Sequence, residues 1–137
     1  MTVERGRPME ETKSTISSFF DYLGFISEET DEPTFDLELP LNPFLLQDDG
    51  TVHPGVFATM LDIMMGATIS RQTDSFATTI SLNLHYFDLH PRNKYTAETT
   101  ILNREGKYVT ADGVIYDEHQ NQIAKASGTF KLNPIKE

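Results

Sequence analysis

The sequence predicts an α+β domain in which a long antiparallel sheet curves around one buried helix. Between Pro54 and Ile69, apolar residues cover most of a helix circumference, which is typical of a helix buried on all sides. After residue 75 the chain alternates like strands, with turn residues between the segments 78–87, 94–104, 107–117 and 122–132. Strands of this length exceed the usual five or six residues. Long neighbouring strands and one buried helix together favour a curved sheet that wraps the helix.

The N-terminal part predicts a tail followed by an amphipathic helix. Residues 1–9 are charged and lack periodicity, so we expect a flexible tail, and we assign residues 10–137 to a single domain. Residues 10–23 show the spacing of one helix face at Ile16, Phe19, Phe20 and Leu23. Gly24 follows at the position of a helix C-cap.

The remaining elements follow from alternation and turn chemistry. Phe35, Leu37 and Leu39 alternate with acidic residues, which predicts a strand with one wet face. Asp48-Asp49-Gly50 is a turn signal, and Pro54 suits the first position of the buried helix. In the segment 78–87 one apolar set alternates with one polar set: Ile80, Leu82, Leu84 and Tyr86 against Thr79, Ser81, Asn83 and His85.

Composition limits the classes of function. The chain has 137 residues and no Cys, so disulfides and thiolate chemistry are excluded. Its net charge of −10 disfavours nucleic acid and anionic membrane surfaces as partners. We find no apolar run of transmembrane length and no signal-peptide pattern, so we expect a cytoplasmic protein. The four His residues show no metal-ligand spacing, and we expect neither a metal nor a cofactor.

Asp62 is the most informative single residue, because it is the only charge between Pro54 and Ile69. A carboxylate in an apolar helix is costly unless it is paired or used in catalysis. The alternative is a structural Asp that bonds to a backbone turn or faces an interface.

The second feature is His53-Pro54-Gly55 at the start of the same helix, where free N–H groups could hold an oxyanion. Its alternative is a plain helix entry capped by His53.

The spacing of these two features links catalysis to oligomerisation. His53 and Asp62 are nine positions apart, which on a helix is a rise of about 13.5 Å and a rotation of about 180°. They cannot meet around one small reacting group within a single chain. If both are catalytic, Asp62 of one subunit works with His53 and Gly55 of another, so the site requires a homodimer.

The stretch QDDGTVHPGVFATMLD, from Gln47 to Asp62, resembles the signature of hotdog-fold acyl-CoA thioesterases of the PaaI-like group. In that signature an Asn precedes His-Gly-Gly by six positions, and an acidic residue follows nine after the His. The resemblance continues through TTISLNLHYFDLHP (78–91), REGK (104–107) and IAKASGTF (123–130), and covers about residues 34–132. It implies a hotdog fold, with one helix wrapped by an antiparallel sheet, and active sites at the interface of a homodimer or homotetramer.

The resemblance also implies roles for individual residues. Asp62 lies at the position of the catalytic carboxylate, which acts as nucleophile or as general base. His53 lies at the motif histidine beside the thioester. Thr79 lies where relatives carry a Ser or Thr that orients water.

Two positions depart from the family pattern. Pro54 replaces the first motif glycine and has no N–H, so Gly55 or Val56 would have to donate to the thioester oxygen. Gln47 replaces the Asn and adds one methylene.

Coenzyme A (CoA), as part of the substrate, also needs basic groups, for which the candidates are Arg71, Arg92, Lys94, Arg104 and Lys107.

Three functions remain open at this stage. The first is hydrolysis of an acyl-CoA, or of an acyl-carrier-protein thioester, to free acid and thiol. The second, motivated by Pro54 and Gln47, is a hotdog protein that binds such a ligand without efficient hydrolysis. The third is a dehydratase or hydratase, which the spacing of His53 and Asp62 fits less well.

Overall fold

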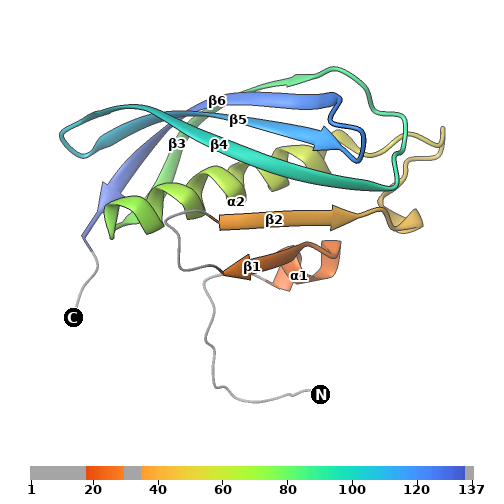
Figure 1. The fold of residues 1–137 in the computed structure, drawn as a ribbon, viewed down its shortest axis with the longest axis horizontal. Helices are drawn as coiled ribbons and strands as arrows, with labels where there is room; N and C mark the ends of the chain where they lie inside the picture. The colour runs from red at the N-terminus through yellow and green to blue at the C-terminus, as the bar shows by residue number, and fades with distance from the viewer. Residues whose placement is uncertain (1–17, 30–34, 135–137) are drawn as a thin grey trace, which may run out of the picture.

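The computed structural model describes residues 18–29 and 35–134. It contains the predicted α+β architecture: a curved antiparallel sheet around one long helix (Figure 1). Six strands lie in the order β1-β2-β4-β5-β6-β3. Within the described ranges, no helix combines the length and apolarity that a bilayer crossing needs.

The helix α2, Pro54–Thr73, runs along the inside of the sheet (Figure 1). It is four residues longer than predicted, and its C-cap is Asp74, whose φ of 53° is left-handed. The helix packs in the core as predicted, but its fully buried side chains lie on one side, and they are Val56, Phe57, Met60, Leu61, Met64, Met65, Thr68 and Ile69. Ile63 and Ala67 are only partly buried. The helix lies close to the sheet at Gly113, where a Cβ would come within 2.9 Å of the Met65 sulfur. These contacts place the middle of α2 against the middle of the sheet.

The four long strands agree with their predicted ranges to within two residues at each end. They are β3 (Phe76–Tyr86), β4 (Lys94–Glu105), β5 (Tyr108–Asp117) and β6 (Gln122–Asn133). The predicted Glu105-Gly106 turn connects β4 to β5, with Gly106 at a φ of 62°. Because β3 pairs with β6 alone, its other edge carries no partner strand within the described chain. This free edge is eleven residues long.

The N-terminal elements form the opposite margin of the sheet. Helix α1 covers Ser18–Leu23, and the predicted residues 10–17 and the tail 1–9 lie outside the described residues. Gly24 has the predicted positive φ, at 94°. Strand β2, Phe35–Pro40, matches the prediction, and the segment after it contains a short 3-10 helix, η2, at Pro43–Leu45. Strand β1, Ile26–Glu29, was not predicted, because four residues reading ISEE show no clear alternation.

Two irregularities in the sheet lie almost level with each other. The pairing of β3 with β6 shifts between Thr79 and Ser81, so that Ile80 is an extra residue. The pairing of β4 with β5 shifts in the same way at Leu102. Through the pairing of β5 with β6, which is regular from Tyr108 to Ile115, these two bulges fall within one residue of the same row. Bulges bend and twist a strand locally, so this row marks where the sheet turns around α2.

The bulge in β3 changes which side chains face the helix. After the bulge, Leu82 pairs with the buried Gly128, so Leu82 lies on the inner face, as the alternation predicts. Before it, Thr79 pairs with the buried Phe130, so Thr79 joins the inner face. The prediction that Thr79 lies on the polar face and Ile80 on the apolar face is therefore wrong, because one inserted residue reverses the alternation. Ile80 is 52% exposed.

Candidate active site

The central contact of the candidate site joins α2 to β3. The hydroxyl of Thr79 donates a hydrogen bond of 2.6 Å to Oδ1 of Asp62. Asp62 is half-buried in the middle of α2, and Thr79 lies on β3, seventeen positions away in sequence. Since a hydroxyl keeps its lone pairs after donating, the Thr79 oxygen and the second oxygen of Asp62 can both accept hydrogen bonds. The pair can therefore hold and deprotonate a water molecule.

The second group of predicted residues surrounds the start of α2. His53 is the N-cap, and its Nδ1 accepts the Gly55 N–H at 2.9 Å. The Val56 N–H donates to the His53 carbonyl at 3.0 Å. Both amides expected to hold a thioester oxygen therefore already have a partner inside the chain, and Pro54 has no N–H to offer.

The capping contact also determines the tautomer of His53. Since Nδ1 acts as an acceptor, the neutral ring carries its proton on Nε2. The side chain is exposed, so this Nε2–H is a donor at the surface beside the helix N-terminus. The dipole of α2 adds partial positive charge at the same point. The Nε2–H of His53 is therefore an exposed donor next to Pro54, which has no backbone N–H.

Gln47 is held by its own turn. Its Nε2 donates to the Thr51 hydroxyl at 3.0 Å, and that hydroxyl donates to Oδ1 of Asp49 at 2.6 Å. The side-chain and backbone bonds from Thr51 lower the pKa of Asp49. Sequence reasoning identified the turn at Asp48-Asp49-Gly50 but missed that Asp49 and Thr51 hold Gln47 through hydrogen bonds. The only signal for this in the sequence is an Asp in a turn with a Thr two positions later.

The loop between β3 and β4 supports the start of α2. The Leu89 carbonyl accepts the Val52 N–H at 2.8 Å, immediately before His53. Arg92 holds this loop, because its Nη2 lies 2.7 Å from Asp88 and its Nε 3.0 Å from Asp117. Sequence reasoning missed this ion-pair network, since Arg92 and Asp117 are twenty-five positions apart.

Hydrogen bonds strongly favour the charged forms of both carboxylates in this network. Burial opposes ionisation of Asp117, but hydrogen bonds from Asn121, His119 and Arg92 outweigh it and lower its pKa to about 2. The backbone N–H and ring of His90, followed by Arg92, lower the pKa of Asp88 to about 2.

The other predicted candidates lie apart from these two groups. His85 is exposed on β3, His90 contacts Asp88, and His119 lies in the turn after β5. Among the described residues no three metal-ligating side chains are grouped together. The structure thus brings Asp62 to Thr79, and it brings the neighbours of Gln47 and His53 together where Leu46 pairs with Val52 before the start of α2. No hydrogen bond among the described residues joins these two groups within one chain.

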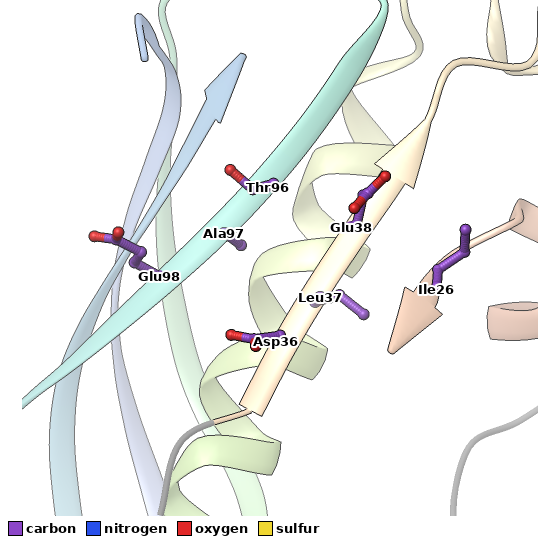
Figure 2. A pocket seen from close by; sticks show the side chains of 7 residues that line it. All are labelled: Ile26, Asp36, Leu37, Glu38, Thr96, Ala97 and Glu98. Atoms are coloured by element: carbon purple, nitrogen blue, oxygen red, sulfur yellow. The ribbon is translucent and has the colours of Figure 1, made fainter. Parts of the chain in front are cut away.

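A separate hollow lies on the outer side of the sheet, over β1, β2 and β4. The hollow has a volume of about 290 Å³. Figure 2 shows the carboxylates among its lining residues, which are Asp36 and Glu38 from β2 and Glu98 from β4. Lys94 offsets part of this charge, with its Nζ 4.0 Å from Glu38. Three carboxylates repel an anionic ligand, so this hollow does not suit a phosphorylated substrate.

Comparison with known families gives this geometry a context. Residues 49–124, which include most of both groups, match the family model of the thioesterase superfamily. The chain belongs to the thioesterase superfamily. No curated protein matches the sequence.

Solved structures of similar proteins confirm the hotdog fold of this thioesterase-superfamily chain. A Bacillus halodurans protein crystallised with CoA is 24% identical, with a TM-score of 0.80 over 90% of this chain and 83% of that one. The PaaI protein of Escherichia coli, from the phenylacetic acid degradation operon, is 14% identical, with a TM-score of 0.76 over 85% and 84%. A thioesterase of Haemophilus influenzae is 17% identical, with a TM-score of 0.76 over 85% and 83%. The predicted family is therefore confirmed.

Proposed function

We propose that the protein hydrolyses an acyl-CoA to a free acid and CoA, at a site shared between two subunits. The observation that carries this proposal is the 2.6 Å hydrogen bond from Thr79 to Asp62. It joins a carboxylate to a hydroxyl that can orient water, in a family of thioesterases. The CoA bound in the Bacillus halodurans structure supports CoA as the carrier.

The reaction follows from the donors and acceptors of the two groups. Water bound between Asp62 and Thr79 attacks the thioester carbon while Asp62 takes its proton. The carbonyl oxygen becomes an oxyanion, which the Nε2–H of His53 and the N-terminus of α2 stabilise. The carbon–sulfur bond then breaks, and the proton held by Asp62 passes to the departing thiolate.

Two subunits are needed because His53 and Asp62 lie on one continuous helix. Nine residues of helix separate them by about 13.5 Å, so one chain cannot close the site. The free edge of β3 offers the contact, since a long strand edge pairs readily with another copy. Pairing two β3 edges places the Thr79 of each subunit near the interface. We therefore propose a homodimer, and a pair of dimers remains open.

The test is release of free thiol from a panel of acyl-CoAs by wild type and Asp62→Asn. We expect the variant to lose about two to four orders of magnitude in kcat, the usual contribution of a general base. Asp36→Asn is the matched control, because it removes the same charge from the outer face of β2. If Asp62→Asn and Asp36→Asn retain equal activity, Asp62 has no catalytic role and the proposal is wrong.

A second function is favoured by the hydrogen bonds around Pro54. Gly55 and Val56 already donate to His53, and Pro54 donates nothing, so a bound thioester would meet few backbone donors. A protein of this kind binds acyl-CoA and keeps it intact. Binding of CoA without thiol release from any member of the panel would establish this second function.

A further inference from the structure

The contact between Thr79 and Asp62 lies in a part of β3 that receives limited support from neighbouring strands. Within the described chain β3 pairs with β6 alone, and that pairing shifts immediately after Thr79. A bulge disrupts the ladder where it occurs. The side chains that contact the start of β3 are therefore the candidates for holding the Thr79 hydroxyl against Asp62.

Ser70, in the last turn of α2, makes such a contact. Its hydroxyl oxygen accepts the N–H of Ala77 at 3.2 Å. Its carbonyl oxygen accepts the N–H of Ser75 at 3.3 Å and that of the C-cap residue Asp74. Ser70 therefore binds both the turn that leaves α2 and the strand that follows the turn.

Asn133, at the end of β6, contacts the same part of β3. Its Nδ2 donates to the Thr78 hydroxyl at 2.8 Å and to the Phe76 carbonyl at 3.4 Å. Helix α2 lies on the inside of the sheet (Figure 1), so Ser70 reaches β3 from that side. Residues 76–78 are thus bonded by side chains from both α2 and β6, in addition to the ladder.

Ser70 and Asp62 connect α2 to β3 at two separate points. They are eight positions apart on the helix, which is a rise of about 12 Å. Asp62 bonds to Thr79, whereas Ser70 bonds to Ala77, two positions earlier in β3. Two separated contacts restrain the strand against pivoting about either one.

Ala77 links the position of Ser70 to that of Thr79. Ala77 and Thr79 lie on the same inner face of β3, since their partners in β6 are the buried Leu132 and Phe130. They are about 6.6 Å apart along the strand. A shift of about 1 Å that both residues shared would lengthen the 2.6 Å bond of Thr79 to about 3.6 Å, which is no longer a hydrogen bond.

We propose that Ser70 is a positioning residue for the hydrolysis, and that it holds Ala77 so that the Thr79 hydroxyl stays bonded to Asp62. Asn133 supports the same segment through Thr78. This inference rests on the proposed function, because it assumes that Thr79 and Asp62 together activate water. Without the Ser70 hydroxyl, the pair is formed for only part of the time.

The kinetic test is a double-mutant cycle between Ser70 and Thr79. We expect Ser70→Ala to lower kcat for the best acyl-CoA about fivefold, the usual net effect of one hydrogen bond, with KM unchanged. In the Thr79→Val background Ser70→Ala should lower kcat no further, because the hydroxyl that it positions is already absent. Ser70→Thr keeps a hydroxyl and should restore most of kcat.

Ser75→Ala is the matched control. The Ser75 hydroxyl lies in the same turn but donates to the Thr73 carbonyl instead of contacting β3, so this variant should keep the wild-type kcat. An equal loss of kcat in Ser75→Ala would overturn the proposal. So would a lower Tm in Ser70→Ala without any loss of kcat, or losses that multiply in the Ser70→Ala/Thr79→Val variant.

Nuclear magnetic resonance provides a readout that does not depend on turnover. Scalar couplings report the χ1 angle of Thr79, and we expect one rotamer in wild type and averaging between rotamers in Ser70→Ala. The Ala77 amide should exchange faster in Ser70→Ala, because it has lost its acceptor. Unchanged couplings of Thr79 would contradict the proposed role of Ser70.

These outcomes separate the role of Ser70 from the proposed function. If no acyl-CoA is hydrolysed but Ser70→Ala averages the Thr79 rotamers, the hydrolase is wrong and the positioning of Thr79 by Ser70 stands. If Asp62→Asn abolishes hydrolysis while Ser70→Ala changes neither kcat nor the Thr79 rotamer, the hydrolase stands and Ser70 is not a positioning residue.

Discussion

The two groups of candidate residues differ in what holds them together. Around the start of α2, the contacts of Gln47, His53 and Gly55 span four positions or fewer in sequence. The contact between Thr79 and Asp62 spans seventeen, and it depends on the packing of a strand against a helix. One group is built by a local turn, whereas the other exists only in the complete fold.

This difference teaches where each group is vulnerable. The local group already satisfies its own hydrogen bonds, so under the proposed function a thioester would have to compete with His53 for the Gly55 N–H or use the Nε2–H of His53. The long-range pair keeps open acceptor positions, but any change in sheet register would separate its two members. Substitutions can test each half of this comparison.

The largest expected effect in this series is at His53. If its Nε2–H stabilises the oxyanion, His53→Ala should lower kcat about a hundredfold, the usual cost of losing one such donor. The measurement is thiol release from the best acyl-CoA. An increase in kcat would show the reverse, namely that the ring blocks the Gly55 N–H in the wild-type protein. Adding Pro54→Gly to His53→Ala supplies a backbone N–H and should recover about tenfold of the loss.

A smaller effect is expected at Thr79. Thr79→Val keeps the branched shape but removes the hydroxyl that bonds to Asp62, and should lower kcat by about ten- to a hundredfold. Thr79→Ser should restore most of the activity, since it keeps the hydroxyl. A Thr79→Val protein as active as wild type would show that the contact only packs β3 against α2.

The smallest effect on activity is expected at Asp117, which acts on stability instead. Its pKa of about 2 in the folded protein lies below the ordinary 3.8, so its ionisation stabilises the fold above about pH 4. That contribution is lost as the pH falls from about 4 to 2. Asp117→Asn should lower Tm at pH 7 and flatten the dependence of Tm on pH between 4 and 2, with kcat at pH 7 nearly unchanged. An unaltered acid profile would contradict this assignment.

Local chemistry in the sequence predicted most of the fold. The buried helix, the four long strands and the turns at Gly24 and Gly106 all follow from patterns within a few neighbouring residues. Strand β1 was missed because its stability comes from pairing with β2 rather than from its own residues. The predicted roles of Asp62, His53, Gly55, Gln47 and Thr79, the dimer and the cytoplasmic location stay predictions.

The register between segments that are distant in the chain could not be predicted from the sequence. The family pattern indicated Thr79, yet simple alternation placed its side chain on the wrong face of β3. The bridge from Arg92 to Asp117 has the same character, because its ends meet only when β4 and β5 have paired. Such contacts depend on how many residues lie between two points, and residue types alone do not reveal this.

The bulge at Ile80 has a consequence for how this protein can evolve. The orientation of Thr79 depends on one extra residue in β3, whatever side chain that residue carries. Substitutions at Ile80 should therefore be tolerated, whereas loss of the residue would turn the Thr79 hydroxyl away from Asp62 in a single step. Under the proposed function, changes of residue type at Ile80 should therefore preserve activity, whereas a change in the length of this strand should not.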